Sequence, residues 1–183
     1  MTGIDSFRRE RLSGFTAIES MVVLAIAAIM LTIAVPAFRG MIDDQKLTTA
    51  ANDLFAAASL TRSEAIGRGV RVDLIAAGDG SDWAKGWVIF IDEDGNQKPD
   101  AGEPVLFSHG PAAAGIAIKS AFTDSKRNYI AYAASGRSRT AANAQAPQVG
   151  SWTLTIDSKV RRIKVNFLGR ARVCNPDVDK STC

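Results

Sequence analysis

Two short strings with the pattern Gly-Arg-x-Arg carry the clearest chemical signal in this chain: GRSR at 136–139 and GRAR at 169–172. Arg170 and Arg172 are two residues apart, so on an extended strand they point to the same side, roughly 6–7 Å from each other. That is close to the spacing of successive phosphates along a nucleic-acid strand. Guanidinium groups bind phosphate oxygens and stay charged at any relevant pH. The pattern predicts a phosphate-binding edge, where Gly169 permits a turn or a close approach of the main chain.

Positive charge is concentrated in the same part of the chain. Residues 39–118 hold seven Lys/Arg and twelve Asp/Glu, a balance of −5, whereas residues 119–183 hold twelve and four, a balance of +8. Four further basic residues are candidates to support the predicted edge: Arg137, Arg139, Arg162 and Lys164. The asymmetry favours a polyanionic partner, and the alternative is a solvated surface with no partner. Because no aromatic residue alternates with the arginines of GRARVC, we expect phosphate contacts without reading of the bases.

An acidic segment at 92–103 is a second candidate site. Its oxygen-bearing side chains have a spacing similar to that of an EF-hand loop: Asp92, Asp94, Asn96, Asp100 and Glu103. Gln97, however, stands where that loop needs glycine, and no helical pattern flanks the segment. We interpret it as a polar hairpin connection and leave calcium binding open. Apart from that open question, we expect no metal site and no cofactor.

Catalytic signals are weak. His109 is the only histidine, and no nucleophile motif lies near it. The sequence contains no Walker loop, metal-ligand cluster or nucleophile elbow. We therefore expect a protein that is not an enzyme.

An apolar segment near the amino end is long enough to cross a membrane. Between Ala17 and Val35 only three residues are polar: Glu19, Ser20 and Thr32. About 19 helical residues span roughly 28 Å, close to the thickness of the hydrocarbon layer. Arginines at 8, 9 and 11 precede the segment, which predicts a cytoplasmic amino end. A carboxylate inside a bilayer costs roughly 3 kcal/mol, so Glu19 is a functional candidate unless it has a partner.

The remainder predicts an α+β fold. Apolar and small residues at alternating spacings of four and three predict a helix face that continues to Gly67 and Gly69: Leu47, Ala51, Leu54, Ala58, Thr61 and Ala65. Strand patterns follow, among them GVRVDLIA, with Val70, Val72 and Leu74 inward, then GWVIFID, PVLFS, GIAIKSA, NYIAYAA, SWTLTID and VRRIKVNFL. Residues 140–150 lack periodicity and predict a mobile loop. The expected architecture is a helix of about 50 residues packed on two small antiparallel sheets.

The amino-terminal pattern resembles the class III signal of type IV pilins and type II secretion pseudopilins. It consists of Gly14, Phe15 and Thr16, then Glu19, a long apolar helix, and Pro36. The resemblance implies that a prepilin peptidase cleaves between Gly14 and Phe15 and that the new amino terminus is methylated. It also implies that Glu19 pairs with the amino terminus of a neighbouring subunit, which makes the buried carboxylate tolerable only in the correct register. Pro36 removes a backbone bond and loosens the helix. An ordinary membrane anchor with an incidental glutamate is the alternative.

The body of the chain is similar to the GspH/FimT group of that superfamily. The segments that carry the resemblance are RSEAIGRGVRVDL and WAKGWVIFIDEDGNQKPDAGEPVL. The resemblance implies a pilin-like fold with three parts: a cleaved leader at 1–14, a transmembrane and assembly helix at 15–38, and a periplasmic domain at 39–183. It implies as partners the prepilin peptidase, other pilins or pseudopilins, and the inner membrane before assembly into a filament.

The carboxyl end resembles the DNA-binding segment of FimT minor pilins, whose GRxR motif maps onto Gly169, Arg170 and Arg172. Cys174 and Cys183 enclose eight residues. An exported domain folds where disulfides form, and a bridge here contributes roughly 2–3 kcal/mol; two free thiols are the alternative.

The leading hypothesis is a minor type IV pilin, at or near the pilus tip, that primes assembly and binds double-stranded DNA for natural transformation. The alternative is a GspH-type pseudopilin of type II secretion, which is structural and binds no DNA.

Overall fold

The computed structural model describes residues 15–143 and 145–183. Within this range the chain forms two compact units, one that ends at Met41 and one that comprises Ile42–Cys183. The predicted leader, including Gly14, lies outside the described residues.

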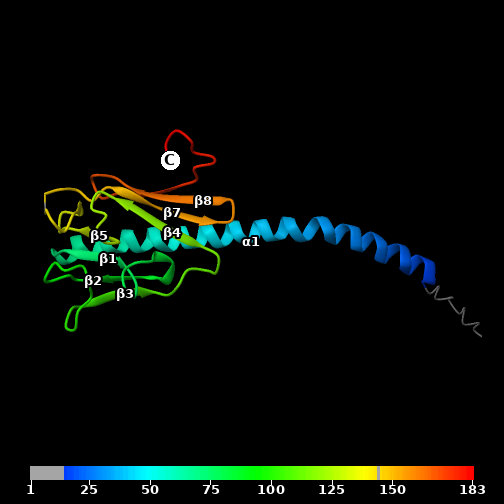
Figure 1. The fold of residues 1–183 in the computed structure, drawn as a ribbon, viewed down its shortest axis with the longest axis horizontal. Coiled ribbons are helices and arrows are strands. Elements are labelled where there is room, and N and C mark those ends of the chain that lie inside the picture. The colour runs from blue at the N-terminus through cyan, green and yellow to red at the C-terminus, as the bar shows by residue number, and fades with distance from the viewer. Residues whose placement is uncertain (1–14, 144) are drawn as a thin grey trace, which may run out of the picture. The chain divides into compact units, whose positions relative to one another are not determined.

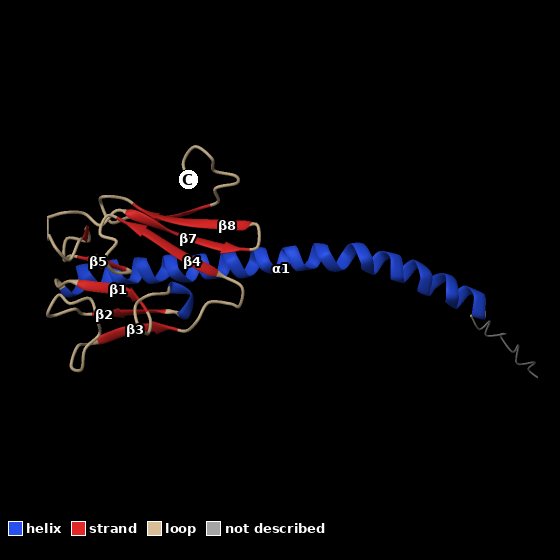
Figure 2. Cartoon of the chain, viewed as in Figure 1, coloured by secondary structure: helices blue, strands red, loops and turns tan. Residues whose placement is uncertain are grey.

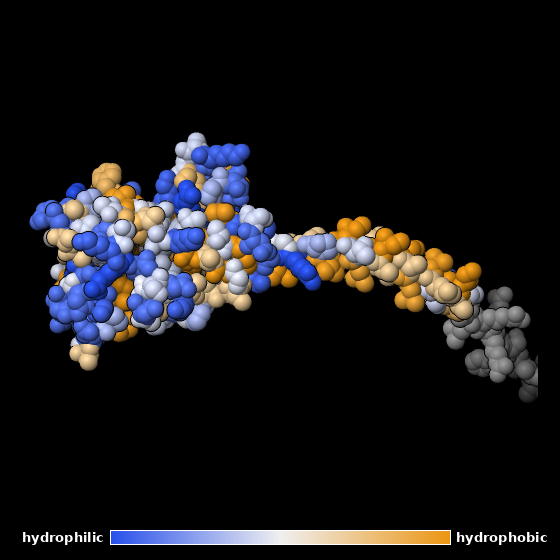
Figure 3. Space-filling model, in the orientation of Figure 1, coloured by the Kyte–Doolittle hydropathy of each residue, from blue (hydrophilic) through white to orange (hydrophobic). Residues whose placement is uncertain are grey.

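The α1 helix (Ala17–Arg68) has 52 residues, which confirms the predicted long helix. It begins with a capping box: the Glu19 N–H donates to Thr16 Oγ1 at 3.2 Å, and the Thr16 N–H donates to Glu19 Oε2 at 3.5 Å. The helix continues through Pro36. Its most apolar 18-residue window has a mean hydropathy of 2.6 and is not buried against the rest of the chain. This half of α1 carries the continuous apolar surface in Figure 3, and its length and composition suit a membrane anchor.

The other half of α1 belongs to the second unit and packs with one face against it. The buried residues of that face are Leu47, Ala50, Ala51, Leu54, Ala57, Ala58, Thr61 and Ala65, as the spacing predicts. Small residues dominate this face, so the sheets can approach the helix axis closely. The helix ends one residue before Gly69, whose φ of 71° is in the left-handed region that favours glycine. Gly67, predicted to help end the helix, lies inside it.

Within the described residues, nine strands form two antiparallel sheets, which confirms the predicted α+β fold. The first sheet has the order β3-β2-β1-β5-β6 and the second the order β4-β7-β8-β9. The strands are β1 (Val72–Ala76), β2 (Trp87–Phe90), β3 (Val105–His109), β4 (Ala117–Phe122), β5 (Tyr129–Tyr132), β6 (Ser138–Arg139), β7 (Gly150–Ile156), β8 (Lys159–Val165) and β9 (Ala171–Cys174). A short 3-10 helix, η1 (Trp83–Lys85), precedes β2.

Both sheets lie against the carboxyl-terminal half of α1 (Figures 1 and 2). The shared core contains the small-residue face of α1 and the inner faces of both sheets. Trp83 and Trp152 meet edge to face in it, with ring centroids 5.3 Å apart. The edge strands β6 and β9 belong to different sheets, and both carry arginines of the Gly-Arg-x-Arg strings.

The first sheet is buried on both faces at its centre. Every residue of β1 is buried, and Ile75, Phe90, Tyr129 and Ala131 form a second, smaller apolar cluster. The expectation that Val70 points inward is wrong, because β1 begins only at Val72 and Val70 is 41% exposed. Residues 140–149 form a loop where they are described, and Gly150 already begins β7. The fully buried Gln148 anchors this loop.

Candidate nucleic-acid interface

The turn between β8 and β9 presents Arg170. The Oδ1 atom of Asn166 accepts hydrogen bonds from the main-chain N–H groups of Leu168 and Arg170, each at 3.0 Å. The Asn166 N–H donates to the Arg170 carbonyl oxygen at 3.1 Å. Arg170 therefore ends a closed turn with its side chain exposed, while Arg172 follows within β9. This turn rigidly holds the main chain from which the first predicted arginine projects.

Alternation along β8 separates its basic residues into two groups. Ile163 and Val165 are buried in the core, and Arg161 shares their face. The Arg161 guanidinium donates to Asp44 Oδ1 on α1 at 2.7 Å, and Lys159 Nζ lies 3.6 Å from the same oxygen. These two charges hold β8 against α1, whereas Arg162 and Lys164 point to the outer face of the sheet.

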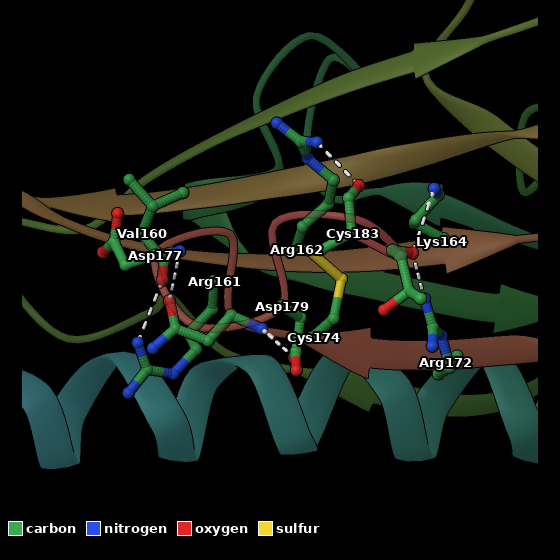
Figure 4. Close-up of a disulfide and its surroundings, with 11 residues drawn as sticks. Val160, Arg161, Arg162, Lys164, Arg172, Cys174, Asp177, Asp179 and Cys183 are labelled. Atoms are coloured by element: carbon green, nitrogen blue, oxygen red, sulfur yellow. Dashed lines mark hydrogen bonds between the residues drawn. A yellow bond between two sulfur atoms is a disulfide. The ribbon is translucent and has the colours of Figure 1, made fainter.

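A disulfide between Cys174 and Cys183 closes the carboxyl-terminal tail over that outer face (Figure 4). Arg162 Nη1 donates to the main-chain oxygen of Cys183 at 3.0 Å. Lys164 Nζ donates to the Thr182 carbonyl oxygen at 3.5 Å, and Arg172 Nη2 donates to the same oxygen. The predicted disulfide is thus present, and three of the predicted DNA-binding side chains hold the tail.

The two Gly-Arg-x-Arg strings lie side by side. A Cβ atom at position 169 would lie 2.7 Å from the Gly136 carbonyl oxygen and 2.9 Å from the Ser138 nitrogen. Both glycines have positive φ, 73° at Gly136 and 75° at Gly169, so each is suited to its turn. Arg137 is exposed next to this contact, and Arg139 is half-buried with Nη1 donating to the Ser138 carbonyl oxygen at 3.2 Å.

Within the described residues, none of these basic side chains is paired with an Asp or Glu side chain; the set comprises Arg137, Arg139, Arg162, Lys164, Arg170 and Arg172. Three of them, Lys164, Arg170 and Arg172, line a groove of about 690 Å³, which we call the basic groove. Its other walls are the start of β7, the end of β8 and the turn that follows, and none of its lining residues is acidic. The groove therefore presents unneutralised positive charge to solvent.

Arg170 also lines a second cavity, of about 440 Å³, which we call the tyrosine pocket. Its walls include Arg62 from α1 and Tyr132 from β5, neither of which the sequence singled out as functional. Arg62 follows Thr61 on the helix, at the border of the buried face, and Tyr132 ends β5, whose residues are all buried. Both positions are equally consistent with ordinary core packing. The sequence therefore did not indicate that Arg62 and Tyr132 line the same pocket.

The acidic segment 92–103 is a loop whose carboxylates bind its own main chain. Asp92 accepts hydrogen bonds from the N–H groups of Gly95, Asn96 and Gln97 at 2.8–3.1 Å. Glu103 accepts from the N–H groups of Glu93 and Asp100 at 2.9 and 3.0 Å. Gln97 has a φ of 58°, so the position where an EF-hand carries glycine adopts the left-handed conformation here as well. The carboxylates of Asp92, Asp94 and Glu103 come within 4.8 Å of one another.

Asp92 also belongs to a buried ionic cluster. Arg71 forms a two-pronged ion pair with Asp73, at 2.7 and 2.6 Å, and lies 3.5 Å from Asp92. Both carboxylate side chains are fully buried. Burial raises the pKa of Asp73 to about 7, although the bonds from Arg71 oppose the shift. Burial would lower the pKa of Arg71, but the two carboxylates outweigh it and raise that pKa.

His109 packs against an aromatic side chain. Its ring stacks on Trp87 with centroids 4.1 Å apart, and Nδ1 lies 2.7 Å from the Gly110 carbonyl oxygen. Nε2 lies 3.8 Å from Asp53 Oδ2 on α1. The sequence indicated no partner for this histidine, and the structure supplies an aromatic one.

At the amino end, Phe15 is 79% exposed and precedes the capping box. Glu19 thus has a local role that the sequence reasoning missed, although the Thr-x-x-Glu spacing signals it. Its predicted pairing with a neighbouring subunit stays a prediction.

The long amino-terminal helix, packed by its second half on two antiparallel sheets, is the architecture of a type IV pilin or pseudopilin. A family model described as "Type II transport protein GspH" matches residues 50–169. The chain therefore belongs to the GspH family of the pilin superfamily.

Solved structures have the same fold. The type IV minor pilin FimU of Pseudomonas aeruginosa (strain PAO1) aligns with a TM-score of 0.60 and 20% identity, over 75% of this chain and 94% of that chain. A second crystal form of FimU aligns with a TM-score of 0.54. The minor pseudopilin EpsH of the Vibrio cholerae Type 2 Secretion System aligns with a TM-score of 0.52 and 10% identity, over 72% of this chain and 98% of that chain. At these identities the likeness concerns the fold alone. No curated protein sequence matches the chain.

Proposed function

We propose that this chain is a minor type IV pilin, incorporated at or near the pilus tip, that primes pilus assembly and binds DNA for uptake in natural transformation. The observation that carries the DNA-binding part is the meeting of the two Gly-Arg-x-Arg turns. Gly169 packs on Gly136, and the arginines that follow both glycines have no acidic partner among the described residues. The basic groove beside them suits a phosphate backbone, which is bound without sequence preference.

The proposal includes a maturation and assembly route. A prepilin peptidase removes residues 1–14 and methylates Phe15, and the apolar half of α1 anchors the chain in the inner membrane with its amino end cytoplasmic. The carboxyl-terminal domain is then periplasmic, where the Cys174–Cys183 disulfide forms. In the filament Glu19 pairs with the amino terminus of a neighbouring pilin, and Pro36 loosens the helix as subunits pack. The protein is not an enzyme in this proposal and takes no cofactor.

The second candidate is a structural subunit of a type II secretion pseudopilus with no DNA binding. The family description and the structural likeness to EpsH favour it. Deletion of the gene separates the two candidates when transformation, piliation and secretion are scored together. We expect transformation to be lost with secretion intact; loss of secretion with normal transformation would establish the second candidate instead.

A direct test uses the full chain purified in detergent and a mobility-shift titration with a short DNA duplex. Arg170→Ala combined with Arg172→Ala is expected to weaken binding by roughly tenfold or more. The slope of the logarithm of the binding constant against the logarithm of the salt concentration should become shallower by about two, one for each lost phosphate contact. A matched control, Lys159→Ala with Arg161→Ala, removes the same charge from two residues that share an ion pair with Asp44. Equal binding by the arginine variant and the unmodified chain would exclude this DNA-binding edge.

A further inference from the structure

The tyrosine pocket lies where α1, β5 and the β8–β9 turn meet. Its lining includes Ser59, Arg62, Ser63, Tyr132 and Arg170. Two of these residues are arginines, two are serines, and none is acidic. A cavity with this lining has a net positive charge and several hydrogen-bond donors, so the group it suits is an anion with oxygen acceptors.

Tyr132, which lines this pocket, carries a hydroxyl donor without a partner among the described residues. Tyr132 is fully buried, and its hydroxyl has no hydrogen-bond partner among the described residues. Burial raises the pKa of this group, so the hydroxyl keeps its proton and remains a donor. The other buried side-chain atoms without a partner there are three indole nitrogens and Arg162 Nε, and none of them lines the tyrosine pocket. Buried polar groups normally have partners, and an acceptor oxygen of a ligand would supply the partner that the Tyr132 hydroxyl lacks.

The two arginines are held in different ways. Arg62 Nε donates to the Gly136 carbonyl oxygen at 2.8 Å, which fixes the guanidinium group, and the structure shows no hydrogen bond from its two terminal nitrogens to a described residue. Arg170 projects from the closed turn that Asn166 caps. A guanidinium fork binds two oxygens of one phosphate. The fixed Arg62 and the Tyr132 hydroxyl therefore form the inner part of a phosphate site, and Arg170 forms its rim.

We propose that the tyrosine pocket binds a backbone phosphate of DNA through Arg62, the Tyr132 hydroxyl and Arg170. This inference rests on the proposed DNA binding. Arg170 lines both this pocket and the basic groove, so a strand that enters the groove brings its next phosphate to the pocket. Phosphate contacts of this kind fix the position of the duplex without reading its sequence. The contact between Gly136 and Gly169 is then part of the site. It brings the Gly136 carbonyl oxygen, which accepts the hydrogen bond from Arg62, next to the turn that carries Arg170.

The test measures binding of a fluorescent DNA duplex to the full chain in detergent, by anisotropy. Tyr132→Phe removes only the hydroxyl, and we expect it to weaken binding about threefold to tenfold without lowering the thermal midpoint. Arg62→Gln is expected to weaken binding about tenfold or more. Arg68→Gln removes the same charge from α1 outside the pocket, where it pairs with Glu64, and should change affinity less than about twofold.

The results separate this inference from the proposed function. If Tyr132→Phe and Arg62→Gln bind like the unmodified chain while the Arg170/Arg172 double variant binds weakly, the pocket is not a phosphate site but the DNA-binding edge stands. If all of these variants bind normally, both proposals fall. Equal weakening by Arg68→Gln, or a lowered thermal midpoint in Tyr132→Phe, would also overturn the pocket, because charge in general or loss of folding would then explain the effect.

Discussion

Gly169 packs directly on the main chain at Gly136. A Cβ atom at position 169 would lie only 2.7 Å from the Gly136 carbonyl oxygen, so there is no room for a side chain. This contact joins the turn before β9 in one sheet to the turn before β6 in the other. The two sheets thus meet at the edge where the basic residues are concentrated. A glycine that the sequence singled out as part of a DNA-binding string is also required by the packing of the fold.

Gly169→Ala should destabilise the domain. The new Cβ would contact main-chain atoms of Gly136 and Ser138, and alanine disfavours a φ of 75°. We expect the free energy of unfolding to fall by roughly 2–4 kcal/mol, measured by urea denaturation. Gly67→Ala is the matched control, because Gly67 lies inside α1 and its new Cβ meets no atom within 4 Å beyond its own neighbouring helix backbone. Alanine should there stabilise the helix by about 0.5–1 kcal/mol. Similar effects of the two substitutions would contradict the close packing at Gly169.

The carboxyl-terminal tail is expected to compete with DNA for the basic side chains on the outer face of the second sheet. Arg162, Lys164 and Arg172 donate to main-chain oxygens of Thr182 and Cys183. The double variant Cys174→Ser, Cys183→Ser removes the covalent tie, which contributes roughly 2–3 kcal/mol to tail closure, and so frees these donors. We predict tighter DNA binding by this variant in the mobility-shift titration. Weaker binding would mean that the closed tail is part of the DNA-binding surface.

Asp73 should give the stability of the domain a distinctive pH dependence. Its pKa is raised from 3.8 to about 7 in the folded chain, so the folded state holds this proton more tightly than the unfolded state. The resulting stabilisation is complete below about pH 4 and is lost as the pH rises through about 7. An asparagine side chain does not titrate, so in the variant Asp73→Asn this contribution is absent.

The measurement is urea denaturation of both proteins between about pH 4 and pH 8, the window that spans the two pKa values of Asp73. The stability of the unmodified chain relative to Asp73→Asn should fall with pH, by at most about 1.4 kcal/mol per pH unit. A relative stability that stays constant over this window would contradict the prediction, because it would show that the pair with Arg71 keeps Asp73 ionised. Because the comparison is a difference between two proteins, the titration of other carboxylates largely cancels.

Several elements could be predicted because their signals are local. The alternation along GVRVDLIA placed Val72 and Leu74 inward, and both are fully buried. The three-and-four spacing of small residues identified the buried face of α1 in the same way. Val70 was misplaced because the alternating pattern begins before the strand does; the turn at Gly69 takes up that residue instead.

The sequence alone determined the long helix with its apolar first half, the two-sheet α+β body, and the basic character of the carboxyl-terminal third. These properties depend on periodicity and composition, which neighbouring residues encode. Only the tertiary structure decided which charges remain unpaired and which residues share a pocket. Arg161 is neutralised by Asp44 from α1, while Arg62, Tyr132 and Arg170 meet from a helix, a strand and a turn. Such contacts depend on how the edges of separate sheets pack on one helix. The residues next to each other in the sequence do not encode that packing.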